Sequence, residues 1–315
     1  MAAIEVRDLR KAYGGLQAVD GVSFEVAEGE VYGLLGHNGA GKSTTVEILE
    51  GHRIRTAGDV SVLGMDPATG GRELRDRIGI VLQTSGVEHE LTVREAIELY
   101  GSAYRRRRPT DELLDLIGLD AKADARIGTL SGGQRRRLDL ALGIVGYPDL
   151  VFLDEPTTGF DPAARRKSWE LVQGLCSLGT TVLLTTHYLD EAEQLADRVG
   201  VLTNGRLVAE GTPDELIAGL ADTVVSFSVD GVDAVALAGA LPPDASFEAG
   251  QVRFTTATPT ADVHRVTTWA LDHDLELRSL TVLRPTLEDV FLGLADDDGA
   301  DGDEASVASG ETGQA

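Results

Sequence analysis

A glycine-rich loop constrains the fold of this chain more than any other feature. It follows the apolar residues 31–35, precedes the helix-like segment 45–50, and consists of Gly36, His37, Asn38, Gly39, Ala40, Gly41, Lys42, Ser43 and Thr44. Glycines let the backbone curl so that successive N–H groups converge on an anion. A phosphate-binding loop requires this strand–loop–helix context. The pattern therefore predicts an α/β fold that binds a nucleoside triphosphate.

Two side chains at the end of the loop suit that chemistry. Lys42 is placed to reach the β- and γ-phosphates, and the Ser43 hydroxyl is placed to ligate Mg²⁺. The helix that follows adds its positive N-terminal end. A chance occurrence of the glycine pattern is the competing explanation.

The composition is that of a globular protein. The chain has 315 residues, 42% of them apolar and 25% charged, which is long enough for two domains. No apolar run approaches the ~20 residues of a membrane helix. Charged residues close to the N-terminus argue against a secretory signal. The single cysteine, Cys176, fits a reducing cytoplasm, and we expect a buried apolar role for it.

The net charge of −24 limits the possible partners. A surface this acidic is repelled by nucleic acid and by anionic lipid headgroups. We therefore expect no nucleic-acid partner and no direct lipid anchor. If the protein works at a membrane, another protein must hold it there.

Hydrophobic patterning divides the first 220 residues into strands and helices. Alternation predicts antiparallel strands within 4–30, and mixed strands follow the loop as far as residue 82. Residues 92–147 have helical spacing, and we place a helical subdomain at about 84–147. Further along lie two apolar runs typical of buried parallel strands and a hairpin: 150–153, 182–184 and 199–209.

A boundary is expected near residue 220, after Gly211, Thr212 and Pro213. Beyond it, the segments 224–229, 233–240, 252–256, 261–271, 275–283 and 287–294 read as β-α-β-α-β-α. That order predicts a small α+β module over 221–294. The acidic tail 295–315 has the composition of a disordered segment.

Two adjacent carboxylates follow the apolar run 150–153. A buried strand would deliver Asp154 beside the loop as a Mg²⁺ partner, and Glu155 is placed to polarise an attacking water. Adjacent acids at a strand end are also common surface features. Their position after a phosphate loop and before Pro156 favours the catalytic interpretation.

Gln83 and His187 also follow predicted strands. An amide at residue 83 can contact Mg²⁺ or orient water, and we expect His187 to emerge on the same sheet edge as Asp154. An imidazole there can bond a γ-phosphate oxygen. Taken alone, His187 would be better explained as a structural histidine.

A second candidate anion site lies at Ser131, Gly132, Gly133 and Gln134. Ser131 is a suitable N-cap for a helix over 135–144, and the two glycines leave N–H groups free to bind an anion. We expect the arginines at 135–137 to face solvent or to help hold a closed dimer.

Together these motifs, with Gly159-Phe160-Asp161-Pro162, resemble the ATP-binding subunit of an ABC transporter over about residues 4–215. Phe160 replaces the leucine usual in that family. The resemblance implies a P-loop NTPase with a RecA-like core, an antiparallel β subdomain and an α-helical subdomain. The domain would span 1–220 and hydrolyse ATP with Mg²⁺.

The resemblance also implies a role for each motif residue. Lys42 would bind phosphates, Ser43 and Gln83 would address Mg²⁺, and Tyr13 would stack on adenine. Glu155 would act as the base and His187 as the γ-phosphate sensor. Ser131 and Gly133 would close over the ATP of a second subunit, and Asp161 would communicate between the two sites.

Residues 50–58 and 284–292 look like the daunorubicin-resistance type of drug-exporter ATPase. In that group the ATPase is a separate polypeptide, which pairs with an integral-membrane permease. This predicts a homodimer at the cytoplasmic face of the membrane, held there by the permease. The permease partner and the export of a small molecule are expectations from the resemblance. The C-terminal module could stabilise the dimer, bind a regulator or simply cap the fold, and we favour dimer stabilisation.

Other classes of nucleotide-binding protein usually have features that differ from those of this sequence. Ribosomal ABC ATPases usually carry two cassettes in one chain, and DNA-repair members carry a long coiled coil. A GTPase should show an Asn-Lys-x-Asp motif, which residues 203–206 do not match, and a small-molecule kinase would lack residues 130–134. A soluble ABC ATPase that acts on a macromolecular partner is the alternative that stays open.

Overall fold

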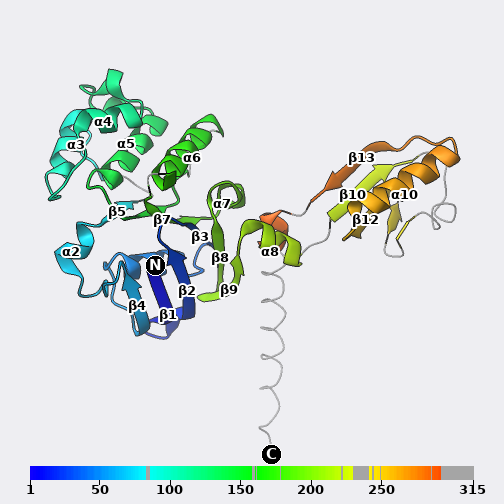
Figure 1. Ribbon diagram of the computed structural model, residues 1–315, viewed down its shortest axis with the longest axis horizontal. Helices are drawn as coiled ribbons and strands as arrows, with labels where there is room; N and C mark the ends of the chain where they lie inside the picture. Colours follow the sequence, from blue (N-terminus) through cyan, green and yellow to red (C-terminus); the bar gives the residue numbers. More distant parts are fainter. Residues whose placement is uncertain are drawn as a thin grey trace, which may run out of the picture. The chain divides into compact units, whose positions relative to one another are not determined.

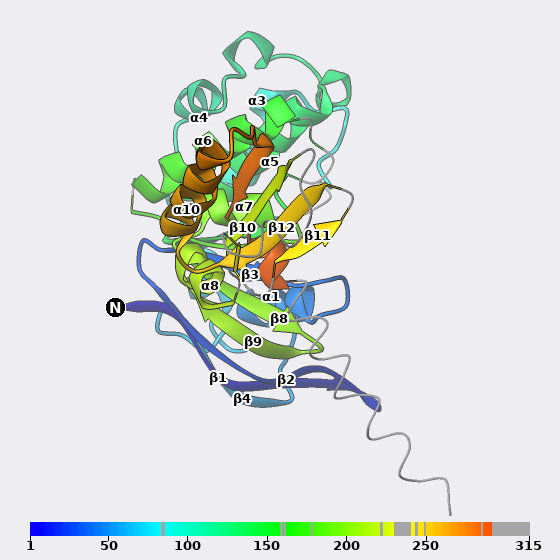
Figure 2. The same ribbon diagram turned by 90° about the vertical axis from the view of Figure 1, so that its right-hand side faces the viewer.

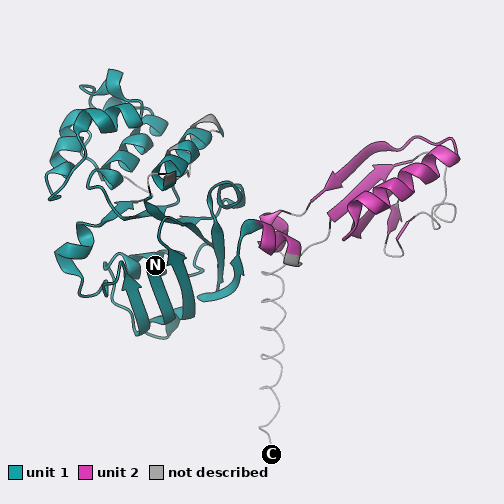
Figure 3. Ribbon diagram, viewed as in Figure 1, with its two compact units in different colours: residues 1–213 teal, residues 214–315 magenta. Residues whose placement is uncertain are grey.

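The protein is described by a computed structural model that covers residues 1–82, 86–157, 160, 162–177, 179–220, 223–229, 241–242, 245–248, 250–284 and 286–291. The chain forms two compact units, Met1–Pro213 (unit 1) and Asp214–Ala315 (unit 2), shown in Figure 3. Each unit has its own hydrophobic core.

A three-stranded antiparallel sheet contains the N-terminus of unit 1. Its strands, in the order β2-β1-β4, are β1 (Ala2–Tyr13), β2 (Leu16–Ala27) and β4 (Ala57–Val62). The alternating apolar residues pair across it, with Ile4 opposite Val26 and Val6 opposite Phe24, and they bury one face of the sheet. The predicted antiparallel strands are therefore confirmed.

A six-stranded, mostly parallel sheet forms the centre of unit 1 (Figure 1). Its order is β5-β6-β7-β3-β8-β9, and only β9 runs antiparallel to its neighbour. The strands are β3 (Val31–Leu35), β5 (Ile78–Val81), β6 (Leu150–Asp154), β7 (Thr181–Thr186), β8 (Arg198–Thr203) and β9 (Arg206–Gly211). Every residue of β3 and β7 is buried, as expected of strands covered on both faces. The carboxyl ends of the parallel strands consequently meet at one edge.

The helices of unit 1 divide between this sheet and a separate helical region, where α3, α4 and α5 lie together (Figures 1 and 2). The capping box of Thr92 and Glu95 starts α3. The helices are α1 (Lys42–Leu49), α2 (Gly71–Arg75), α3 (Val93–Gly101), α4 (Thr110–Leu116), α5 (Gly132–Ile144), α6 (Pro162–Ser177) and α7 (Leu189–Leu195), with 3₁₀ turns at Asp120–Lys122 and Ile127–Thr129.

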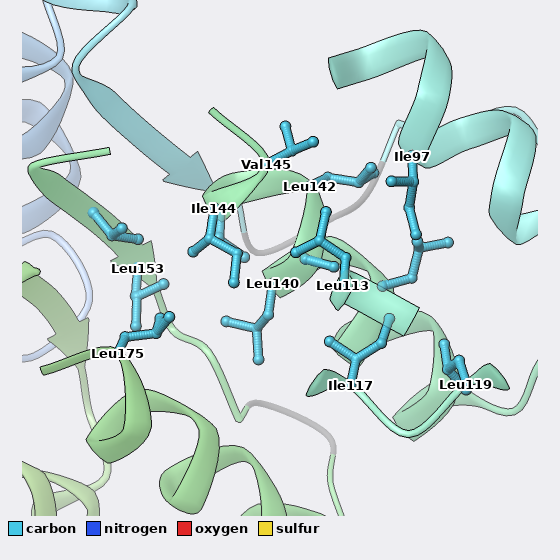
Figure 4. Packing of buried hydrophobic residues seen from close by; sticks show 14 of the residues in the cluster. Ile97, Leu113, Ile117, Leu119, Leu140, Leu142, Ile144, Val145, Leu153 and Leu175 are labelled. Atoms are coloured by element: carbon cyan, nitrogen blue, oxygen red, sulfur yellow. The ribbon is translucent and has the colours of Figure 1, made fainter. Parts of the chain in front are cut away.

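One apolar cluster joins the helical region to the sheet. Figure 4 shows Leu140 and Ile144 of α5 between Leu113 of α4 and Leu153 of β6. Leu113 has no exposed surface, and Leu140 and Leu153 are 2% and 1% exposed. Because α5 packs against α4 in the helical region and against β6 in the central sheet, this cluster fixes the position of α5 relative to both.

Unit 2 is a four-stranded antiparallel sheet with α10 (Pro259–Asp272) across one face (Figure 1). Val225, Phe227, Val252 and Phe254 of the sheet pack with Val266 of that helix. The other elements are α8 (Pro213–Leu220), β10 (Thr223–Ser228), β11 (Ser246–Glu248), β12 (Gln251–Thr256) and β13 (Arg278–Leu283).

The sequence predictions for unit 2 hold in part. The short strand β11 was not expected, and the helix predicted at 233–240 lies outside the described residues. The compact units divide after Pro213, and a distinct role for the module stays a prediction. Among the helices that the structure describes, none has the length and apolar character needed to cross a membrane.

Two leucines of α4 test the packing of the helical region. Leu113→Ala should lower the free energy of unfolding by about 2–5 kcal/mol, because it leaves a cavity in the buried cluster. Leu116, which is 38% exposed on the same helix, provides the control, and Leu116→Ala should cost less than about half as much. Urea unfolding of the full chain measures both. Equal costs would contradict the packing described for α4.

Candidate nucleotide site

The glycine-rich loop connects β3 to α1 and makes its tightest approaches at two glycines. Gly41, with φ +102°, is the N-cap of α1, and a Cβ there would lie 2.5 Å from the Ala18 carbonyl oxygen. A Cβ on Gly36 would lie 2.5 Å from the Leu202 carbonyl oxygen. The loop therefore fits between its neighbours only without side chains at these two positions.

Lys42 is buried within the loop, with 6% of its surface exposed. Its Nζ donates to the carbonyl oxygens of Gly36 at 2.6 Å and His37 at 3.1 Å. Burial lowers the pKa of Lys42, and the nearby charges of Glu155 and Asp154 oppose that shift. This ammonium, the loop amides and the N-terminus of α1 make a donor set that fits a triphosphate.

The other loop residues frame this donor set. Gly36 and Ala40 are buried, whereas His37, Asn38, Gly39 and Ser43 are exposed and Thr44 is half-buried. The Ser43 hydroxyl thus stands at the surface of the first turn of α1. A hydroxyl such as that of Ser43 and a carboxylate such as that of Asp154 suit Mg²⁺, which usually takes few protein ligands and completes its shell with phosphate oxygens and water.

The two predicted carboxylates lie where β6 ends beside β7. Thr185 Oγ1 donates to Asp154 Oδ1 at 2.5 Å, and the Glu155 amide donates to the Thr185 carbonyl oxygen at 3.0 Å. Glu155 has φ +45°, an unusual conformation for a residue with a side chain. This turn at the strand end directs the backbone of Glu155 away from the path of β6.

His187 meets Glu155 at this edge. Its Nδ1 lies 3.0 Å from Glu155 Oε1, and the side chains are 37% and 13% exposed, respectively. The structure thus brings together Lys42, Asp154, Glu155 and His187, whose arrangement at one sheet edge was expected. The direct contact between His187 and Glu155 was not.

Other predicted residues lie in different places or beyond the described structure. Tyr13, 38% exposed at the end of β1, has the Lys11 ammonium 4.9 Å from its ring centre and the Arg53 guanidinium 5.3 Å from it. Gln83 and Asp161 lie outside the described residues.

The N-cap predicted at Ser131 is confirmed. Ser131 Oγ accepts from the Gln134 amide at 3.3 Å, and Gln134 Oε1 accepts from the Ser131 amide at 2.9 Å. This capping box starts α5 at Gly132, so Gly132 and Gly133 supply first-turn amides, which have no acceptor within a helix.

The expectation that the arginines at 135–137 face solvent or a dimer partner is wrong for Arg136. Its side chain is 6% exposed and donates to backbone carbonyls at the ends of β5 and β6. The sequence did carry a signal. Arg136 lies one helical turn before Leu140 and two before Gly143, both on the buried face of α5. The charge of three consecutive arginines obscured this spacing.

Glu50 is a second group that sequence reasoning missed. It ends α1 with 6% exposure, and its Oε2 lies 3.1 Å from His52 Nδ1. Burial raises the pKa of Glu50 to about 8, and the charges of Asp154 and Glu47 contribute to the rise. A further acid is therefore held close to the carboxylate at the end of β6.

This geometry defines a P-loop nucleotide-binding cassette, and comparisons with known proteins agree. The ABC transporter family profile matches residues 19–158. A second profile, described as the C-terminal domain of proteins like the ABC transporter domain-containing protein, matches residues 224–286.

Among curated relatives, the Nod factor export ATP-binding protein I of Paraburkholderia xenovorans is 42% identical over 301 residues, covering 93% of this chain and 97% of its own. The daunorubicin/doxorubicin resistance ATP-binding protein DrrA of Streptomyces peucetius is 42% identical over 306 residues, covering 93% of this chain and 92% of its own.

Solved structures show the same fold. An ATP-binding subunit of an ABC transporter aligns with a TM-score of 0.62 at 32% identity, covering 68% of this chain and 91% of that one. An ATP-binding cassette in a dimeric, post-hydrolysis state with ADP and Pi aligns with a TM-score of 0.60 at 26% identity, covering 66% of this chain and 98% of that one.

The chain belongs to the ATP-binding subunits of ABC transporters, a family that binds and hydrolyses ATP. The predicted fold class, the family and the ATPase activity are confirmed. The family works together with membrane components of transporters.

Substitution of Gly41 tests the loop geometry. Gly41→Ala should raise the Kd for a fluorescent ATP analogue by at least about 10-fold, or 1.4 kcal/mol, because the added Cβ meets the Ala18 carbonyl. Gly29→Ala is the control, since Gly29 also has a positive φ, +78°, but nothing lies within 4 Å of its Cβ. Equal affinities for the two variants would show that the close approach at Gly41 does not matter for binding.

Proposed function

We propose that this protein powers export of a small molecule, by hydrolysing magnesium-bound ATP between two copies of the chain attached to a membrane permease. The relatives that cover more than nine-tenths of the chain act in Nod factor export and in daunorubicin resistance, which supports export as the direction. The chain would stand at the cytoplasmic face of the membrane through that permease. The cluster of Lys42, Asp154, Glu155 and His187 carries the hydrolysis step of the proposal.

The residues of the cluster, together with Ser43 and Gln83, have distinct tasks in hydrolysis. Lys42 binds the β- and γ-phosphates, while Ser43, Gln83 and Asp154 hold Mg²⁺. When bound, Mg²⁺ supplies positive charge that offsets the charge of the phosphate oxygens. The 13% exposed carboxylate of Glu155 accepts a proton from the attacking water.

The contact between His187 and Glu155 supports their joint role. At 3.0 Å the imidazole restrains the carboxylate, and the β6 and β7 strand ends hold both residues. When both ring nitrogens of His187 carry a proton, Nδ1 donates to Glu155 and the second nitrogen, Nε2, donates to a γ-phosphate oxygen. The base and the phosphate sensor are therefore positioned by one another.

The second half of each site comes from the other copy of the chain. The start of α5, with Ser131, Gly132, Gly133 and Gln134, offers first-turn amides and a helix N-terminus to the γ-phosphate. A two-fold axis then makes two composite sites from two chains. Tyr13 stacks on adenine, and Asp161 communicates between the sites.

A groove of about 380 Å³ in unit 1 suits the permease. Most of the side chains that line it are apolar or aromatic, although His52, Arg75 and Asp139 also line it. Leu82 and Tyr100 are 54% and 40% exposed. Exposed apolar surface of this kind is typical of a protein–protein contact. The groove borders residue 82, which precedes Gln83, so a bound permease segment would lie next to the nucleotide site. The lining includes Ile80, Leu82, Val87, Tyr100, Tyr104 and Leu142.

Glu155→Gln tests the assignment of the base. The variant should lower ATP turnover by roughly 10² to 10⁴, the usual contribution of a general base, while ATP affinity stays close to that of the wild type. Phosphate release and titration with a fluorescent ATP analogue measure the two quantities. Glu28→Gln, at an exposed turn after β2, is the control. Undiminished hydrolysis by Glu155→Gln would remove Glu155 from this role.

The same variant tests the composite site. Because Glu155→Gln traps unhydrolysed ATP, magnesium-ATP should convert monomers into dimers, as seen by light scattering, whereas ADP should not. Adding Ser131→Arg places a bulky cation at the start of α5 and should leave the protein monomeric. A monomeric Glu155→Gln variant at saturating ATP would count against ATP-bridged dimers.

A further inference from the structure

Arg136 occupies an unusual position for a charged residue. It lies in α5 five positions after Ser131, with 6% of its surface exposed. No salt bridge to Arg136 occurs within the part of the chain that the structure describes. A cation that is buried in this way must be satisfied by hydrogen bonds to neutral groups.

Those bonds go to four backbone carbonyl oxygens. Arg136 donates to Leu82, which follows β5, and to three residues at and after the end of β6: Asp154 at 3.1 Å, Glu155 at 3.4 Å and Pro156 at 2.9 Å. The planar guanidinium presents its donors in a rigid fork, so these carbonyls are held in a fixed arrangement. Hydrogen bonds from a charged donor are also stronger than those between neutral groups.

Two glycines allow α5 to come close enough for this contact. A Cβ on Gly79 of β5 would lie 2.0 Å from the Gly143 carbonyl oxygen, and a Cβ on Gly143 would lie 2.5 Å from Val81 Cγ2. The helix therefore rests directly on the backbone of β5. Arg136, two turns nearer the helix start than Gly143, then reaches both strand ends.

We propose that Arg136 is a positioning residue for ATP hydrolysis, which ties the helix that carries Ser131 to the backbone of Glu155 and to the segment leading to Gln83. The inference rests on the proposed role of Glu155. A displacement of α5 moves the carbonyls that Arg136 holds and so changes where the Glu155 carboxylate lies. Engagement of Ser131 with ATP in a dimer thereby sets the geometry of the base.

The energetics favour this role over a simple contribution to stability. Burial lowers the pKa of Arg136, and the charges of Asp139, Asp154 and Glu191 oppose that shift. Burial of a cation costs free energy that an apolar side chain would avoid. The contacts of Arg136 with the end of β5 and with the segment that carries Glu155 give this costly residue a function that packing alone does not.

The test compares Arg136→Met with Arg136→Lys in the full chain. Arg136→Met keeps much of the side-chain bulk but removes every donor, and we expect kcat to fall roughly 10- to 100-fold with KM for ATP changing less than about 3-fold. Arg136→Lys keeps a cation and should recover part of kcat. Arg7→Met, on a side chain that is 76% exposed, is the control.

Chemical rescue separates positioning from stability. Arg136→Ala should regain turnover when guanidinium chloride is added below denaturing concentrations, with sodium chloride and urea at equal concentrations as controls. Thermal unfolding and binding of the ATP analogue are measured on the same samples. Rescue of kcat by guanidinium alone would support the inference.

Two outcomes would overturn the inference, and a third would overturn the proposed role of Glu155 on which it rests. If Glu155→Gln loses turnover but Arg136→Met keeps it, Arg136 does not position the base and this inference is overturned. If Arg136→Met loses ATP affinity and stability in proportion to kcat, and guanidinium does not rescue Arg136→Ala, the residue is structural and the inference is again overturned. If Glu155→Gln itself keeps its ATP turnover, the proposed role of Glu155 as the general base is wrong, independently of the result for Arg136.

Discussion

The pairing of β3, β7 and β6 is the interaction on which the site depends. In the parallel ladder Leu35 lies opposite Thr186, and Asp154 lies opposite Thr185. The residues that follow each strand therefore emerge side by side, and the loop that starts at Gly36 begins next to His187. A shift of one residue in either pairing would turn these side chains to the opposite face of the sheet. Every residue of β3 and β7 is buried, so such a shift would also require the side chains along both strands to repack.

Burial and neighbouring charge shift the pKa values of two groups at this edge, Lys42 and Glu50. Burial lowers the pKa of Lys42, whereas the neighbouring carboxylates of Glu155 and Asp154 favour its charged form. Glu50 shows the converse effect, since burial and the charge of Asp154 raise its pKa to about 8. The Lys42 ammonium and the N-terminus of α1 are therefore the groups that offset the negative charge of Glu155 and Asp154 next to the loop.

Local sequence signals predicted those parts of the site that depend on one segment. The loop at 36–44, the N-cap at Ser131 and the carboxylates after an apolar strand each have a short pattern with a physical cause. The edge shared by Asp154 and His187 followed from parallel-strand geometry. Arg136 and Glu50 were missed because their burial depends on packing between distant segments. Charge alone suggested exposure, and only the helical spacing of Arg136 indicated otherwise.

The position of α5 links these observations. Its N-terminus carries Ser131, its middle holds the strand ends through Arg136, and Gly143 lets its later turns rest on β5. Leu140 and Ile144 fix the same helix in the core that Leu153 of β6 shares (Figure 4). A rigid helix that is bonded to both strand ends transmits a displacement, whereas a flexible loop would absorb it. One helix can therefore make the reactivity of Glu155 depend on what contacts Ser131.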